Sequence, residues 1–257
     1  MKRWRQPYQG SRVLKSIPIL WLVAALAGCH NRTAQPVDEQ ARQAFTRDMM
    51  QVLQRGIRHA DTGAQVGAVS LKITLDRQSA PIGCEATRAR AKHRLLLPSD
   101  VPTTDFQALA RLVEAQCWKN IYPLVPPTMV DDDGITEIVV PMILMLPKEL
   151  QAPGTPRRQA NAQRDYFWQH LLRDQQVNSI GRVSVYYQAD AQGKVEGCLV
   201  RLYPHPMRMA EFRLDGELQA RLNNRCMALD LRNLPGFVAD QQGYTALDYA
   251  PWRVGQP

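Results

Sequence analysis

Gly67-Ala68-Val69-Ser70 and Gly181-Arg182-Val183-Ser184 are two versions of one short stretch, and they lie 114 residues apart. The same offset carries Cys84 onto Cys198, and after a single gap of five residues an offset of 109 carries Cys117 onto Cys226. Glycines, prolines and aspartates continue the series in the same order. The chain therefore carries an internal repeat, and two copies of this length predict two tandem globular modules.

Hydrophobic periodicity predicts the elements of the first module. Apolar residues recur at steps of three and four from Asp38, which predicts a helix that ends near Gly56 to Gly63. Apolar and polar residues then alternate from Val69 to Leu75, which predicts a half-buried strand. A second strand carries Cys84, a helix runs from Phe106 to Cys117, and a third strand covers 135–146. The stretch 92–101 is read as a strand end and a loop.

The second module repeats this order. A helix around Tyr166–Leu172 comes before strands at Val183–Tyr187 and Val195–Leu199. A helix with Leu214, Leu218, Leu222 and Cys226 on one face follows, and Tyr244–Tyr249 is the last strand. Each module is predicted as a helix followed by strand-strand-helix-strand. The expected fold class is α+β, with a three-stranded antiparallel sheet in each module.

The first 28 residues have the layout of an export signal, with basic residues, an apolar run from Ile17 to Ala27 and then small residues. That run is too short to span a bilayer, which takes about 20 apolar residues. Leu26-Ala27-Gly28-Cys29 resembles the lipobox of bacterial lipoproteins. The resemblance implies cleavage before Cys29, a diacylglyceryl group on its thiol and a fatty-acyl chain, such as palmitate, on its amine. The alternative is an ordinary signal peptide that happens to contain a cysteine.

Lipidation would fix the location of the protein. Two or more acyl chains anchor a protein stably. In the lipoprotein family an aspartate after the cysteine usually marks retention in the inner membrane, and here His30 stands in that place. The resemblance therefore implies an outer-membrane lipoprotein facing the periplasm. The expected organisation is a signal peptide (1–28), a tether (29–37), a first module (38–148), a linker (149–158) and a second module (159–257).

With Cys29 assigned to lipid, four cysteines remain in a protein bound for an oxidising compartment, where thiols pair. Three connectivities are possible. The repeat favours one bond inside each module, Cys84–Cys117 and Cys198–Cys226. A zinc site is the rival interpretation, and the absence of any Cys-x-x-Cys argues against it.

Charge and motifs exclude several classes of function. Residues 1–28 hold five basic and no acidic residues, so the formal charge falls from +8 to +3 without them. With no basic stripe, nucleic-acid binding is not expected. No histidine lies in a metal or nucleophile motif, so neither a catalytic site, a metal nor a cofactor is expected. His205, Met207 and Met209 are the one cluster with donors suited to Cu(I), and a loop of apolar and turn residues is the alternative.

Each module also resembles the C-terminal domain of the TonB family. The order shared by both copies is a glycine, a valine-rich strand ending in aspartate, a Gly-Cys strand, a helix ending in cysteine, a proline and Asp-x-x-Gly. In the second copy it is carried by Gly181, Val183, Asp190, Gly193, Val195, Cys198, Leu218, Cys226, Pro235, Asp240 and Gly243. In the first it is carried by Gly67, Val69, Asp76, Cys84, Leu109, Cys117, Pro126, Asp131 and Gly134. The family's energy transducers also have a membrane helix, a long proline-rich spacer and a Tyr-Pro pair before the first strand, which this chain lacks.

The resemblance implies a module that binds protein partners, often by adding a partner strand to a sheet edge. The expected function is a lipid-anchored, non-enzymatic adaptor of an envelope assembly for transport or secretion. The third strands, 135–146 and Tyr244–Tyr249, are the edges expected to take a partner. The alternatives are an outer-membrane lipoprotein that binds peptidoglycan or a small ligand, and a hydrolase whose site is assembled across the two modules.

Overall fold

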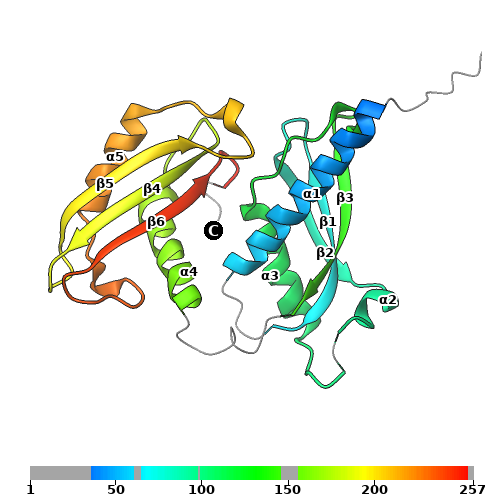
Figure 1. Ribbon diagram of the computed structural model, residues 1–257, viewed down its shortest axis with the longest axis horizontal. Helices are drawn as coiled ribbons and strands as arrows, with labels where there is room; N and C mark the ends of the chain where they lie inside the picture. Colours follow the sequence, from blue (N-terminus) through cyan, green and yellow to red (C-terminus); the bar gives the residue numbers. More distant parts are fainter. Residues whose placement is uncertain (1–35, 61–64, 98, 146–155, 254–257) are drawn as a thin grey trace, which may run out of the picture. The chain divides into compact units, whose positions relative to one another are not determined.

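The computed structural model of the chain describes residues 36–60, 65–97, 99–145 and 156–253 (Figure 1). The predicted signal peptide, the predicted lipidation site Cys29 and residues 149–155 of the predicted linker lie outside these ranges. In the part of the chain that is described, no helix combines the length and the apolar character needed to cross a bilayer.

The described residues form two modules with matching element order. The first contains α1 (Pro36–His59), β1 (Gly67–Leu75), β2 (Pro81–Arg88), α2 (Ala91–Arg94), α3 (Phe106–Lys119), the 3₁₀ turn η1 (Pro127–Met129) and β3 (Thr136–Leu144). The second contains α4 (Pro156–Phe167), the π-helical segment η3 (Trp168–Leu172), β4 (Gly181–Ala189), β5 (Val195–Pro204), the 3₁₀ turn η4 (Met209–Glu211), α5 (Gly216–Met227), the 3₁₀ turn η5 (Leu231–Asn233) and β6 (Gln242–Tyr249). Both sheets are antiparallel, with strand orders β2-β1-β3 and β5-β4-β6. The predicted fold class, α+β with two tandem small modules, is confirmed.

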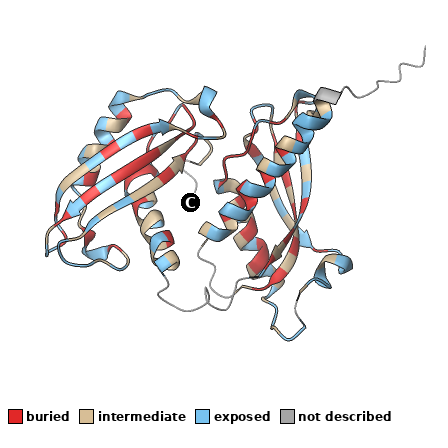
Figure 2. Cartoon of the chain, viewed as in Figure 1, coloured by how far each residue is buried: buried red, intermediate tan, exposed pale blue. Residues whose placement is uncertain are grey.

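Each core lies between one face of a sheet and two helical segments (Figure 2). The period-two alternation of β1 buries Val69, Leu71, Ile73 and Leu75, none of them more than 1% exposed. Residues of α1 and α3 cover them, and η3 and α5 cover the equivalent face of β4. Burying each such side chain contributes about 1.5–3 kcal/mol, so these alternating stripes hold the modules together.

One disulfide bond ties the second strand of each module to the helix that follows. Cys84 on β2 is bonded to Cys117 on α3, and Cys198 on β5 is bonded to Cys226 on α5. The Cα–Cα distance is 6.1 Å in both bonds. The pairing within modules is the one that the repeat predicts.

The repeat extends to the hydrogen bonds of the first hairpin. The Asp76 carboxylate accepts from the backbone N–H groups of Gln78 and Ala80, both at 2.8 Å. The Asp190 carboxylate accepts from those of Gln192 and Lys194 at 2.9 and 2.8 Å. The equivalent left-handed positions are Ser79 (φ 57°) and Gly193 (φ 80°). The offset of 114 residues therefore matches a shared turn geometry as well as shared residue types.

Four details differ from the sequence-based expectations. Residues 91–94 form the short helix α2, within the stretch expected to be a strand end and loop. α1 begins at Pro36, two residues before the predicted start at Asp38. Pro156 begins α4, because proline suits the first turn of a helix, so this helix starts inside the predicted linker. Leu214 is 70% exposed and precedes α5, because the Asp215 carboxylate accepts from the Leu218 N–H and starts the helix there.

Candidate functional site

The segment after β5 joins the two modules. Arg208 is 2% exposed, and its guanidinium donates to the carbonyls of Tyr122 at 2.9 Å and Gln78 at 2.6 Å in the first module. The Glu211 carboxylate neutralises it from within the second module. The Met207 side chain packs against the core of the first module. The corresponding stretch of the first copy is five residues longer and includes α2, but it has no equivalent of the His205, Met207 and Met209 cluster. In the second copy the segment acts as a clamp between the modules.

Further contacts extend this joint. Ile121 of the first module packs with Ile180 and Ala250 of the second, and Trp252 covers them. The Trp252 indole N–H donates to the Asn120 carbonyl at 3.3 Å. The Arg58 carbonyl near the end of α1 accepts from Asn161 at 3.0 Å and from Arg157 at 2.8 Å, both on α4. Apolar burial and buried polar bonds thus fix the two modules against each other.

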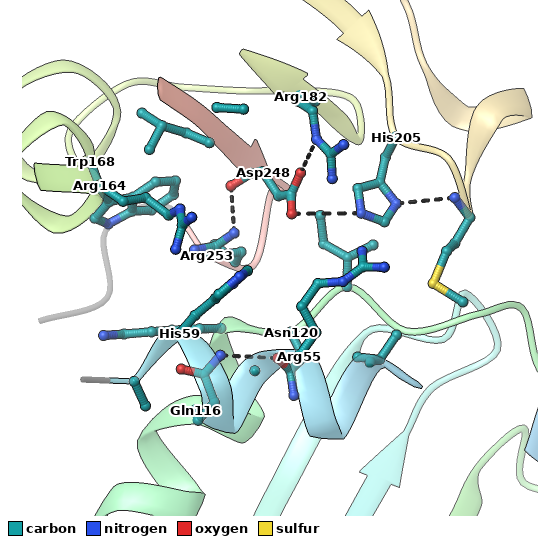
Figure 3. A pocket seen from close by; sticks show the side chains of 18 of the residues that line it. Arg55, His59, Gln116, Asn120, Arg164, Trp168, Arg182, His205, Asp248 and Arg253 are labelled. Carbon is teal, nitrogen blue, oxygen red and sulfur yellow. Dashed lines mark hydrogen bonds and ion pairs between the residues drawn. The ribbon is translucent and has the colours of Figure 1, made fainter. Parts of the chain in front are cut away.

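A cleft of about 760 Å³ lies beside this joint (Figure 3). Its lining comes from α1, α3, α4, β4 and β6, from the loop after β5 and from the residues after β6. Figure 3 shows Arg55 and His59 of the first module and Arg182, His205, Asp248 and Arg253 of the second around the same space. The cleft therefore exists only where the two modules meet.

Asp248 is the acidic centre of the cleft. Its carboxylate accepts from Arg182 Nε at 2.7 Å, and His205 Nε2 lies 3.8 Å from its other oxygen. Burial alone would raise the pKa of Asp248, but the hydrogen bond and the positive charge of Arg182 outweigh burial, so the pKa is lowered. The carboxylate is therefore ionised and its charge is matched by Arg182.

The other charges of the cleft are mostly positive. The Arg253 guanidinium donates to the Asp248 carbonyl and lies over the Trp168 ring, 4.3 Å from its centroid. Burial lowers the pKa of Arg253 to about 10, which still leaves the group charged at neutral pH. Arg164 donates to Asn161 at 3.0 Å, and burial lowers its pKa as well. These guanidinium groups give the cleft a positive lining.

The two histidines of the cleft are neutral. Burial, the largest cause, lowers the pKa of both His59 and His205 to about 4, and nearby arginines add to the effect. His205 Nδ1 accepts a hydrogen bond from the Met207 N–H at 3.3 Å. The positive lining therefore comes from arginine and lysine and not from histidine.

A second surface of interest is the set of sheet edges. On β2 the Ala86 N–H donates to the Glu114 carboxylate at 2.8 Å. On β5 the Val200 N–H donates to Asn223 at 2.9 Å and the Leu202 N–H to Gln219 at 3.1 Å. Ala86 and Glu114 correspond in the repeat to Val200 and Asn223. In both modules the helix thus covers the edge of the second strand, and among the described residues neither third strand has a side-chain cap of this kind.

The two third-strand edges differ from each other. Pro141 lies within β3, opposite Ser70, and proline has no N–H to offer a partner. β6 has no proline. The Gln241 carbonyl accepts from the Ala189 N–H of β4, whereas the Asp248 carbonyl accepts from Arg253. Backbone N–H and C=O groups alternate sides along an antiparallel strand. The odd-numbered residues of β6 therefore direct these groups toward β4, and the even-numbered residues direct them away from it.

An apolar row crosses the open face of the second sheet next to that edge. Tyr186 of β4 lies opposite Leu199 of β5 and Tyr244 of β6. The three side chains are 47%, 45% and 57% exposed, and the two tyrosine rings lie 4.7 Å apart. Isolated exposed apolar residues are common on protein surfaces, but a continuous row across three strands favours a contact surface.

Most of the residues singled out in the sequence lie away from the cleft and the β6 edge. The four paired cysteines lie in the module cores and line neither the cleft nor the edge of β6. His205 lines the cleft, but Met209 is 65% exposed and Met207 packs on the first core, so the three side chains do not converge on a copper ion. In the described ranges, no group of three or more His, Cys, Asp or Glu side chains has the arrangement of a metal site.

Sequence analysis missed the cationic cleft and the clamp residue Arg208. The one available signal was the change of offset between Cys84 and Leu109, which shows that the segment containing Arg208 differs in length from its counterpart in the first copy. Comparison with protein-family models, curated proteins and solved structures found no match for this chain.

Proposed function

We propose that the protein is a lipid-anchored periplasmic adaptor that binds an extended segment of a partner protein along the β6 edge. It would be a non-enzymatic part of an envelope assembly for transport or secretion. The observation that carries the proposal is the difference between the sheet edges. Helix side chains cap the second strands and proline interrupts β3, whereas on β6 the one outward group with a described side-chain partner is the Asp248 carbonyl at the C-terminal end. Strand addition uses just such an edge.

The row formed by Tyr186, Leu199 and Tyr244 supports the same location. In strand addition, main-chain hydrogen bonds give affinity and neighbouring side-chain contacts give selectivity. Aromatic side chains supply large contact areas at low cost in conformational entropy. A partner strand on β6 would lie directly beside Tyr244, which is the most exposed residue of this row.

The cellular setting rests on the sequence. The resemblance of residues 26–29 to a lipobox supports an anchor on Cys29, and His30 supports the outer membrane. The resemblance of each module to the TonB C-terminal domain supports a partner-binding role. Two disulfide bonds suit an oxidising compartment such as the periplasm.

Site-specific photocrosslinking in cells tests the edge. A photoreactive residue replaces Tyr244 in the full-length protein, and the adducts are compared between Ala246→Pro and Ala246→Ser backgrounds. Ala246→Pro removes an outward N–H without removing a bond to β4, so binding should weaken about tenfold through the lost bond and the steric clash. Ala246→Ser keeps the N–H and should keep the adduct. An unchanged adduct in a correctly folded Ala246→Pro protein would rule out strand addition at β6.

Fractionation tests the anchor separately. Cys29→Ala should abolish incorporation of labelled fatty acid and release the protein from sedimented membranes. A Cys29→Ala variant that still sediments with membranes would refute lipid anchoring without bearing on the β6 edge.

A further inference from the structure

The inter-module cleft carries more positive than negative charge. Five basic residues line it, Arg55, Lys119, Arg164, Arg182 and Arg253, against three acidic ones, Asp48, Asp165 and Asp248. Arg182 is matched by Asp248, and Asp48 lies 3.8 Å from Arg47 outside the cleft. The side chains of Arg55 and Lys119 are exposed, and neither forms a hydrogen bond or ion pair with the side chain or backbone of another described residue. The surplus therefore lies on cations that face the space from the first module.

One donor inside the cleft is buried and unused. The Nε–H of Arg253 has no hydrogen-bond partner in the described structure, although the same guanidinium donates from another nitrogen to the Asp248 carbonyl. A buried charged donor without a partner is energetically unfavourable when nothing compensates it. The Trp168 ring holds this guanidinium in place, so the free donor has a fixed direction. An acceptor entering the cleft would satisfy it.

The size and composition of the cleft favour a small organic molecule. Pockets for such ligands usually measure about 300–1,000 Å³, and the volume here is about 760 Å³. A single inorganic ion would leave most of this space empty. Guanidinium groups bind carboxylate and phosphate oxygens in pairs of parallel hydrogen bonds, which favours a ligand bearing one of these groups.

We propose that the cleft between the modules is a binding site for a small organic oxyanion, bearing carboxylate or phosphate groups, held by Arg55, Lys119 and Arg253. The ligand would contact both modules at once. The site shares Ala246 and Asp248 of β6 with the proposed edge, but two of its three anchoring cations, Arg55 and Lys119, belong to the first module, so variants of these two residues test the site without altering β6.

Isothermal titration calorimetry on the full-length protein in detergent tests the site. Citrate represents carboxylates, glycerol 3-phosphate represents phosphates, and glycerol is the uncharged comparison. We expect citrate, glycerol 3-phosphate or both to bind, and glycerol not to bind. The anion that binds more tightly shows whether the site prefers carboxylates or phosphates. Absence of binding by both anions up to millimolar concentration would overturn the proposal.

Matched variants separate this site from a general effect of charge. Arg55→Gln should weaken anion binding about tenfold, because it removes a charged donor from the cleft. Arg111→Gln removes an exposed charge from the same module outside the cleft and should change the affinity less than about twofold. Equal weakening by both variants would mean nonspecific attraction and would overturn the proposal. The Arg55 side chain is exposed, so the variant should fold.

Discussion

Arg208 is a buried cation whose partners are backbone carbonyls and Glu211. In Arg208→Met the side-chain volume is nearly kept, but Glu211 loses its countercharge and two carbonyls lose a donor. Breaking a buried ion pair by removing one member costs about 3–5 kcal/mol. We expect urea unfolding to show a loss of stability of about that size, whereas Arg213→Met, at an exposed position, should change it by about 0.5 kcal/mol or less. A loss below about 1 kcal/mol for Arg208→Met would show that the clamp contributes little.

The histidines of the cleft predict a dependence on pH. In the folded protein the pKa of His59 and of His205 is about 4, whereas in the unfolded chain it is about 6.5. Between these values the unfolded chain binds more protons, so stability falls as the pH drops from 6.5 toward 4. At His205 the negative charge of Asp248 raises the pKa, whereas the positive charges of Arg182, Arg55 and Arg208 lower it further.

Melting temperatures at pH 7 and pH 5 measure this dependence. The wild-type protein should melt at a lower temperature at pH 5, and a variant with His59→Gln and His205→Gln should lose less on the same change. His170→Gln, at an exposed position, should behave like wild type. If the double variant and wild type respond equally, the cleft histidines are not the cause.

Among the strands, removing a side chain that covers the edge of β5 should lower the stability of the fold. Asn223→Leu removes the acceptor of the Val200 N–H on the β5 edge. An unsatisfied backbone donor costs about 1–3 kcal/mol when water cannot replace its partner, and an open edge can pair with another chain. We expect lower stability and more concentration-dependent association by light scattering than in Asn224→Leu, at the exposed neighbouring position. Equal behaviour of the two variants would show that Asn223 does not protect this edge.

The elements themselves were largely predictable, because each depends on a local pattern. The alternation of apolar and polar residues predicted β1 and β4, and apolar residues on one helical face predicted α3 and α5. The failures are local too: Leu214 fits the helical stripe by spacing, yet it lies outside the helix, because the carboxylate of Asp215, the next residue, caps the start of α5. The cleft could not be predicted, because its residues lie on seven separate segments and converge only when the modules pack. Arg208 looks like any loop arginine until its acceptors, about 85 and 130 residues away, are known.

For the whole molecule, the two disulfide bonds predict how stability is shared between the modules. They close loops of 33 and 28 residues, each worth about 4 kcal/mol in the chain-entropy model. Replacing Cys84 and Cys117 by alanine should destabilise the first module by about that amount. Replacing Cys198 and Cys226 should do the same to the second. Chemical unfolding, followed by hydrogen exchange in each module, distinguishes these results.

Contacts between the modules modify this prediction. Because Arg208, Met207 and Trp252 link the two cores, loss of one disulfide bond should also lower protection of the other module next to the joint. Protection that falls only in the module with the missing bond would indicate that the modules unfold independently.

The order of the cysteines along the chain has a consequence for how the protein is made. Both bonds join cysteines that follow each other directly among the four. If the chain is exported from its N-terminus with lipid on Cys29, as proposed, Cys84 and Cys117 emerge before Cys198, so each remaining thiol first meets its final partner. Correct oxidation then requires an oxidant alone, with no enzyme to reshuffle wrong pairs, and maturation can finish in one module while the other is still being delivered.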